Sequence, residues 1–196
     1  MRGLEQIPWL YDGLMGVADL LGVARWRREL VAGAAGRVLE VGCGTGRNLP
    51  LYPDAADLVG VDPNPAALAR ARRRAPRARL VVGRVESLPF ETDAFDTVVT
   101  SLVFCSVDDP LRGLAEIRRV LRTGGQLRML EHVRARGRRL AALQDRIAPL
   151  WTRLTGGCRP NRDIEHLVQQ AGFRIEQHWT DATHLIRRFA AVAESR

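Results

Sequence analysis

The stretch Val38-Leu39-Glu40-Val41-Gly42-Cys43-Gly44-Thr45-Gly46-Arg47-Asn48 decides the fold, together with Leu58-Val59-Gly60-Val61-Asp62 that follows it. An apolar run that ends in closely spaced glycines predicts a buried strand and a tight turn, and we expect a helix to start near Arg47. The glycines at 42, 44 and 46 let the backbone approach a ligand where a Cβ would clash. Asp62 ends the second strand, where nucleotide-binding βαβ units hold a ribose diol.

The glycine spacing separates this turn from a dinucleotide site. A G-x-G-x-x-G fingerprint needs its third glycine at position 47 or 49, and the chain has Arg47 and Leu49 there. Taken alone, the turn is also compatible with a tight strand-to-helix connection in some other α/β protein.

Strands and helices alternate from Arg37 onward, which is the pattern of a mostly parallel sheet covered by helices on both faces. The sequence therefore predicts an α/β, Rossmann-like single domain, with a core over 35–196 and a helical segment over 1–34. We expect that segment to lie over the ligand edge of the sheet as a lid, although plain packing would leave the same apolar pattern. Strands are expected at 37–41, 58–62, 79–83, 96–101, 126–131, 173–179 and 185–192, and helices from near 65, over 111–121, from 138 to about 154, and over 163–171.

The composition is that of an ordinary globular protein, with a strongly basic charge. Its 196 residues carry a net charge of +8, and the sequence contains arginine but no lysine. The arginine clusters at 70–74 and 134–139 are typical of solvated helix faces, and few aromatic residues accompany them, so a nucleic-acid partner is not expected. Weak association with an anionic membrane surface remains compatible with this charge.

Neither the apolar runs nor the cysteines indicate a membrane span, a disulfide framework or a metal site. No run approaches the length of a bilayer-spanning helix, and the N-terminus lacks the zones of a signal peptide, so we expect a cytoplasmic protein. Cys43, Cys105 and Cys158 are odd in number and widely spaced. They are expected to be free thiols in a reducing compartment, with no bound metal.

The pattern E-V-G-C-G-T-G, with Asp62 twenty residues after its first glycine, resembles the S-adenosyl-L-methionine site of class I methyltransferases. The resemblance implies that the turn holds the methionine part of this cofactor and Asp62 its ribose hydroxyls. The segment 82–90 resembles the part that reads the adenine, although many relatives carry Asp where this chain has Arg84. The cofactor residues implied are Tyr11, Glu40, Gly42, Cys43, Gly44, Gly46, Asn48, Asp62, Pro63, Val85, Glu86, Ser101 and Leu102.

Four further pieces resemble one subgroup, the methyltransferase-like alkyl-thiol methyltransferases and their small bacterial relatives. They are V-D-P-N-P at 61–65, L-V-F-C-S-V at 102–107, E-H-V at 131–133 and G-G-C-R at 156–159. The similarity runs from about Tyr11 to about Phe173. It implies methyl transfer from S-adenosyl-L-methionine to a small-molecule acceptor, a small apolar thiol.

Methyl transfer from a sulfonium needs alignment, exclusion of water and removal of the acceptor's proton. A thiol of pKa about 8.5 needs only a nearby base or cation to supply its thiolate. His132, at the end of the fifth strand, is the candidate base, although a hydrogen-bonded structural histidine fits the pattern equally well. Glu131 is a candidate to orient it, but neighbours on a strand point to opposite faces. Cys105, beyond the fourth strand, is a candidate to face the substrate, although a small buried cysteine is common in protein cores.

Other functions stay open at this point. Phosphatidylethanolamine N-methylation and C-methylation of a quinone ring are the alternatives that share the glycine turn. A third alternative is a regulatory module that binds the cofactor without turnover. The presence of all three turn glycines and of Asp62 disfavours it. A nucleic-acid methyltransferase is disfavoured because Ser101-Leu102-Val103-Phe104 is apolar where such enzymes hold the base.

Overall fold

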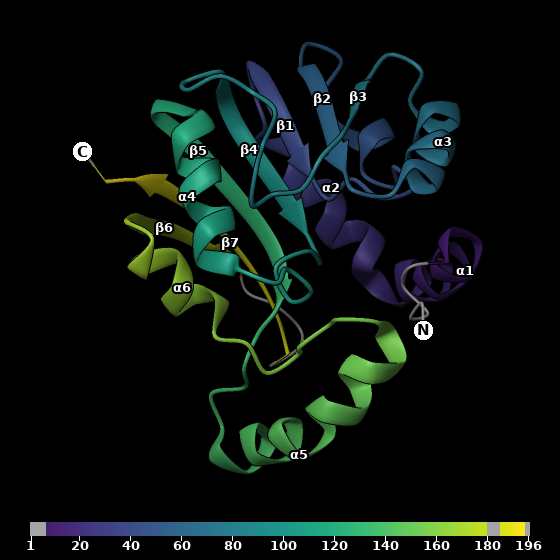
Figure 1. Cartoon of the computed structure of the whole chain (residues 1–196), viewed down its shortest axis with the longest axis vertical. Coiled ribbons are helices and arrows are strands. Elements are labelled where there is room, and N and C mark those ends of the chain that lie inside the picture. The colour runs from purple at the N-terminus through teal and green to yellow at the C-terminus, as the bar shows by residue number, and fades with distance from the viewer. Residues whose placement is uncertain (1–6, 180–184, 195–196) are drawn as a thin grey trace.

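Seven strands form one sheet in the order β3-β2-β1-β4-β5-β7-β6 (Figure 1). The structure is a computed structural model, and it describes residues 7–179 and 185–194. The first six residues of the predicted N-terminal segment therefore lie outside the described residues. The strands are β1 (Arg37–Val41), β2 (Asp57–Asp62), β3 (Arg79–Val82), β4 (Phe95–Ser101), β5 (Leu121–His132), β6 (Phe173–Trp179) and β7 (Ile186–Ala193).

Strands β1 to β5 are parallel to one another, and β7 runs antiparallel to both β5 and β6. Chain order reverses between β1 and β4, which lie side by side although β2 and β3 separate them in sequence. Ligands of open α/β sheets bind beyond the carboxyl ends of the strands at such a reversal. The predicted fold class, a Rossmann-like seven-stranded and mostly parallel sheet, is thereby confirmed.

Apolar side chains from alternate positions of the strands feed two cores, one on each face of the sheet. Val38 packs with α2 and α3, whereas its neighbour Leu39 packs with α4 and α6. The helices are α1 (Pro8–Ala18), α2 (Ala24–Ala32), α3 (Pro65–Arg74), α4 (Pro110–Val120), α5 (Arg138–Thr155) and α6 (Ile164–Gln170), with a π-helical turn η2 (Asp19–Val23) that joins α1 to α2.

Helix α5 stands apart from the sheet, beyond the carboxyl ends of β4 and β5 (Figure 1). Apolar side chains on one side of it, among them Ile147, Leu150 and Trp151, are substantially exposed. Even so, no helix among the described residues is long and apolar enough to cross a membrane.

The prediction of a helix that starts near Arg47 is wrong. After the glycine turn the chain makes only the 3-10 turn η3 (Leu49–Leu51) and then becomes extended at Tyr52, with φ −69° and ψ 149°. Tyr52 precedes Pro53, and a residue before proline is pushed out of the helical region by the proline ring. The helix predicted for 111–121 ends at Val120, and β5 begins one residue later.

Candidate active site

A cavity of about 360 Å³ lies at the carboxyl ends of β1, β2 and β4. Nine of the residues predicted to bind a cofactor line it: Tyr11, Gly42, Gly44, Asp62, Pro63, Val85, Glu86, Ser101 and Leu102. Other residues of its wall were not among the predicted cofactor residues, and they include Pro8, Thr45, Asn64, Arg84, Val103, Ser106, Asp108, Gly156 and Gly157. Thr45, Asn64, Arg84 and Val103 adjoin predicted residues in sequence, whereas Pro8, Asp108, Gly156 and Gly157 come from segments that the fold brings to this place.

The glycine turn needs its glycines for two different reasons. Gly42, Gly44 and Gly46 all have positive φ, of 66°, 53° and 80°, a conformation that costs other residues energy. A Cβ on Gly42 would also stand 2.4 Å from Cγ2 of Val103, and one on Gly46 would stand 2.8 Å from the backbone of Ala71 in α3. Gly42 therefore allows the loop after β4 to close on the cavity, and Gly46 allows α3 to pack beneath the turn.

The Asp62 carboxylate is fixed by backbone amides at the edge of the cavity. It accepts hydrogen bonds from the Gly44 amide at 2.9 Å and from the Asn64 amide at 2.8 Å. Burial raises the pKa of Asp62, and these two hydrogen bonds oppose the rise. The carboxylate is thus held in place by the turn, and it lines the cavity beside Pro63.

Three charged residues, Arg84, Glu86 and Asp108, form another side of the cavity. The Arg84 guanidinium donates to Glu86 at 3.3 Å and to Asp108 at 2.8 Å, so it joins the loop after β3 to the loop after β4. Val85, between these charged residues, is buried against the cavity. Where many of the methyltransferases that this segment resembles carry Asp, this chain has Arg84, a cation that positions Glu86.

Helix α1 is fastened to the glycine turn by Asp12, a residue that sequence reasoning did not single out. Asp12 accepts from the Thr45 hydroxyl at 2.6 Å and from Arg74 at 2.9 Å, and it pairs with Arg70 at 3.2 Å. Burial raises the pKa of Asp12, but the hydrogen bonds from Arg74 and Thr45 outweigh it, so the net shift is downward. These contacts keep Pro8 and Tyr11 at the cavity. Opening and closing of α1 as a lid stays a prediction.

Four predicted cofactor residues lie behind the turn and do not line the cavity: Glu40, Cys43, Gly46 and Asn48. The Asn48 amide donates to Glu40 at 2.8 Å and accepts from the buried Arg27 of α2 at 2.9 Å. Burial raises the pKa of Glu40 to about 7. Cys43 is buried in the core cluster on the α2 and α3 face. These residues support the turn from beneath.

Glu131 is fully buried and shapes the loop after β4. Its carboxylate accepts from the Thr100 hydroxyl at 2.9 Å, the Val103 amide at 3.0 Å and the Phe104 amide at 3.1 Å. This anchor accompanies a positive φ of 59° at Leu102. Burial raises the pKa of Glu131 to about 7. Glu131 positions the loop, and its oxygens are directed at that loop's amides instead of toward His132.

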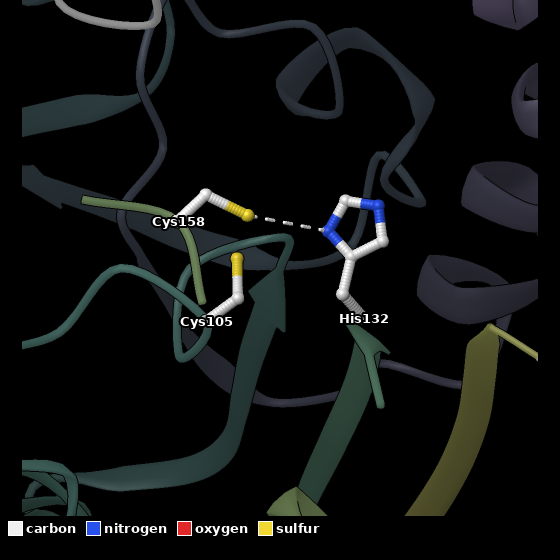
Figure 2. A group of neighbouring side chains, drawn as sticks. All are labelled: Cys105, His132 and Cys158. Atoms are coloured by element: carbon white, nitrogen blue, oxygen red, sulfur yellow. Dashed lines mark hydrogen bonds between the residues drawn. The ribbon is translucent and has the colours of Figure 1, made fainter. Parts of the chain in front are cut away.

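His132 and Cys105 meet a third residue, Cys158, which sequence reasoning had left as an isolated thiol (Figure 2). Sγ of Cys158 lies 3.8 Å from Nδ1 of His132, and both thiols are buried. The hydrogen bond between the two thiols lowers the pKa of Cys158 and raises the pKa of Cys105. The interaction with His132 also lowers the pKa of Cys158. We call these three residues the Cys-His-Cys cluster.

A second cavity, also of about 360 Å³, opens along α5. Apolar side chains of Leu140, Leu143, Ile147, Trp151, Leu185 and Ile186 make most of its wall, and His132 lies among them. The cofactor-side cavity instead contacts Ser106 and Gly157, the chain neighbours of Cys105 and Cys158. The Cys-His-Cys cluster therefore reaches the apolar cavity through His132, and its two cysteines adjoin in sequence residues of the cofactor-side wall.

Comparison with known proteins identifies the domain. Residues 39–129 match the family model described as the methyltransferase domain. Among curated proteins, the chain is 33% identical to the thiol S-methyltransferase TMT1B of Rattus norvegicus over 72% of its own length and 62% of the relative's. It is 37% identical to the phosphatidylethanolamine N-methyltransferase of Cereibacter sphaeroides (58% and 59% covered) and to the demethylmenaquinone methyltransferase of Renibacterium salmoninarum (62% and 53%). The chain spans less than two thirds of each relative's length.

Solved structures share the fold at lower sequence identity. The methyltransferase in the Haloferax volcanii complex with the Trm112 activator superposes with a TM-score of 0.76 at 18% identity, over 100% of both chains. An S-adenosylmethionine-dependent methyltransferase of Mesorhizobium loti gives a TM-score of 0.64 at 20% identity, over 88% of this chain and 99% of that one.

Proposed function

Because the chain carries a class I S-adenosylmethionine-dependent methyltransferase domain, we propose that it methylates the sulfur of a small apolar thiol. The observation that carries the proposal is the Cys-His-Cys cluster, whose His132 lines the apolar cavity and whose cysteines adjoin in sequence Ser106 and Gly157 of the cofactor-side wall. Similarity to thiol S-methyltransferases supports the same acceptor class.

The residues present fit S-adenosylmethionine, which is the cofactor of this domain. The cavity is of ligand size, and glycines with positive φ bring the backbone to it with no Cβ in the way. Asp62 offers carboxylate oxygens to a diol, and the side chains of Val61, Val85 and Val107 offer apolar surface to a flat ring. When bound, the cofactor supplies a methyl group on a sulfonium centre, whose departure leaves a neutral thioether.

The chain's own residues have three tasks in this proposal. Helix α1 and the loop after β4 exclude water from the cofactor-side cavity. The apolar wall of α5 binds the hydrocarbon part of the acceptor. The Cys-His-Cys cluster, with His132 as the residue at the acceptor's cavity, promotes loss of the acceptor's proton, because the thiolate is the nucleophile.

An acceptor panel tests the proposal. Purified protein is incubated with isotope-labelled S-adenosylmethionine and alkyl thiols of increasing chain length, with cysteine, phosphatidylethanolamine vesicles and a demethylated quinone as competing classes. Each methylene buried in the second cavity contributes about 0.8 kcal/mol, so kcat/KM should rise about fourfold per added CH₂ until the cavity is full. Methylation of vesicles or quinone without any methyl thioether would establish one of the alternative functions instead.

Two matched variants localise the acceptor. Ile147→Ser places a hydroxyl in the wall of the second cavity, whereas Leu150→Ser changes an exposed leucine of the same helix outside that wall. Ile147→Ser should flatten the chain-length dependence, and Leu150→Ser should keep it. Equal effects of the two variants on the chain-length dependence would place the acceptor elsewhere.

A further inference from the structure

Three side chains of types that can bind soft metal ions come together from separate parts of the chain (Figure 2). Cys105 lies on the loop after β4, His132 ends β5, and Cys158 lies on the loop after α5. Their ligand atoms, two thiol sulfurs and an imidazole nitrogen, all lie within 4.8 Å of one another. A site with both thiolate and imidazole ligands binds zinc in preference to magnesium or calcium.

The separation of these atoms is close to that of ligands around one zinc ion. Zinc bonds of about 2.3 Å to sulfur and about 2.0–2.1 Å to nitrogen, at a tetrahedral angle, put the two ligand atoms about 3.6 Å apart. The observed distance from Sγ of Cys158 to Nδ1 of His132 is 3.8 Å. Binding an ion therefore needs a contraction of a few tenths of an ångström at this pair, which side-chain rotation supplies.

The backbone around the two cysteines is already fixed. The Arg159 amide donates to the Cys105 carbonyl at 2.8 Å, which ties the two cysteine loops together. The Cys158 amide donates to the Thr155 hydroxyl at 3.2 Å, and its carbonyl accepts from Thr152 at 2.9 Å. Glu131 holds the loop that carries Cys105, as described above. Supporting hydrogen bonds of this kind orient metal ligands and raise affinity.

We propose that Cys105, His132 and Cys158 bind one Zn²⁺ ion and leave its fourth coordination position to the sulfur of the methyl acceptor. Two thiolates balance the charge of the ion, and three protein ligands with one open position are the pattern of catalytic zinc. The proposal rests on the proposed thiol methylation, because His132 lines the apolar cavity and the chain neighbours of the two cysteines, Ser106 and Gly157, line the cofactor-side cavity.

The chemistry balances without a redox step. The acceptor thiol displaces water from zinc, its sulfur bonds to the ion, and its proton passes to solvent. The coordinated sulfur then forms a bond to the methyl carbon while the bond from that carbon to the sulfonium sulfur breaks, and its electron pair stays on the departing thioether. The methylated product is itself a neutral thioether, a weak zinc ligand, so water or the next thiol replaces it.

Metal binding can be measured independently of methyl transfer. The full-length protein is purified without chelator, dialysed and assayed for zinc by mass spectrometry, and the apo protein is reloaded with Co²⁺. We expect one zinc per chain, and a thiolate-to-cobalt charge-transfer band with tetrahedral visible bands. Cys158→Ser and His132→Asn should lose the stoichiometric zinc, whereas Cys43→Ser, which changes a buried thiol in the other core cluster, should retain it.

Other outcomes overturn the site. Wild-type protein without stoichiometric zinc and without the cobalt charge-transfer band would refute it, as would zinc retained unchanged in Cys158→Ser. A Cys105–Cys158 disulfide, seen as a loss of two mass units in protein kept in reductant, would do the same. Circular dichroism of each variant identifies misfolded protein, and for a misfolded variant the chelator-stripped wild type, reloaded with zinc, provides the comparison.

The role of the fourth position has its own readout. Addition of an alkyl thiol should shift the cobalt spectrum, and zinc removal should lower thiol methylation at pH 7 by up to about 30-fold, since a thiol of pKa about 8.5 is only about 3% ionised there. Zinc bound with no thiol methylated would refute the proposed function and leave the metal site standing. Thiol methylation at an unchanged rate in zinc-free protein would refute the coordination step alone.

Discussion

Replacing Glu40 by glutamine should change how the stability of this protein depends on pH. Glu40 is 2% exposed in β1, and its carboxyl accepts a hydrogen bond from Asn48 that the glutamine carbonyl can also accept. Burial raises its pKa from 4.5 to about 7, and the neighbouring Asp62 adds to the rise. Glutamine keeps the shape and removes the ionisation.

The sign follows from proton linkage. Between about pH 4.5 and 7 the folded protein keeps the Glu40 proton that the unfolded chain has released, so wild-type stability falls as pH rises through this window. At 1.36 kcal/mol per pH unit, a pKa difference of about 2.5 corresponds to about 3 kcal/mol, fully expressed above pH 7. Glu40→Gln should therefore match the wild type near pH 4.5 and exceed its stability by about 3 kcal/mol at pH 8.

Urea denaturation followed by fluorescence at several pH values from 4.5 to 8 measures this difference. Glu91→Gln, which neutralises an exposed carboxylate in the loop before β4, is the matched control and should follow the wild type. Stability curves for Glu40→Gln and wild type that stay parallel across the whole range would refute the reasoning. A Glu40→Gln protein that is destabilised relative to the wild type by the same amount at pH 8 and at pH 4.5 would also refute it.

Three further changes probe the cofactor-side cavity. Asp62→Ala should weaken S-adenosylmethionine binding by about 1.5–3 kcal/mol, about 10- to 100-fold by calorimetry, whereas Asp57→Ala at the exposed start of the same strand should leave it unchanged. Gly42→Ala should lower stability by about 2–4 kcal/mol, from left-handed strain plus the clash; Gly124→Ala has the same backbone strain with open space around it, so an equal loss there would refute the clash. Asp12→Asn should speed hydrogen exchange in α1 and weaken cofactor binding, and unchanged exchange in α1 would show that other contacts hold the helix.

The sequence was sufficient for the fold and for the part of the cofactor-side wall that the glycine turn and the end of β2 build. Strand positions follow from short apolar runs, and Gly42, Gly44 and Asp62 carry their roles in their residue type and spacing. These features are local, because a turn and the strands beside it are fixed by residues within about twenty positions of one another. The helix wrongly predicted near Arg47 has a local explanation too, the Tyr52–Pro53 step, which the periodicity alone did not reveal.

Only the tertiary structure decided what surrounds that turn. Asp12 and Arg74 are 62 positions apart, and nothing in either segment indicates that they pair across the glycine turn. Cys105 and Cys158 have no metal-binding spacing, yet the sheet brings the loop after β4, the end of β5 and the loop after α5 to one place. Long-range placement depends on how helices and loops pack on the sheet, which no short window of sequence encodes. The sequence by itself therefore determined the donor side of this protein, whereas the proposed acceptor side exists only where distant segments meet.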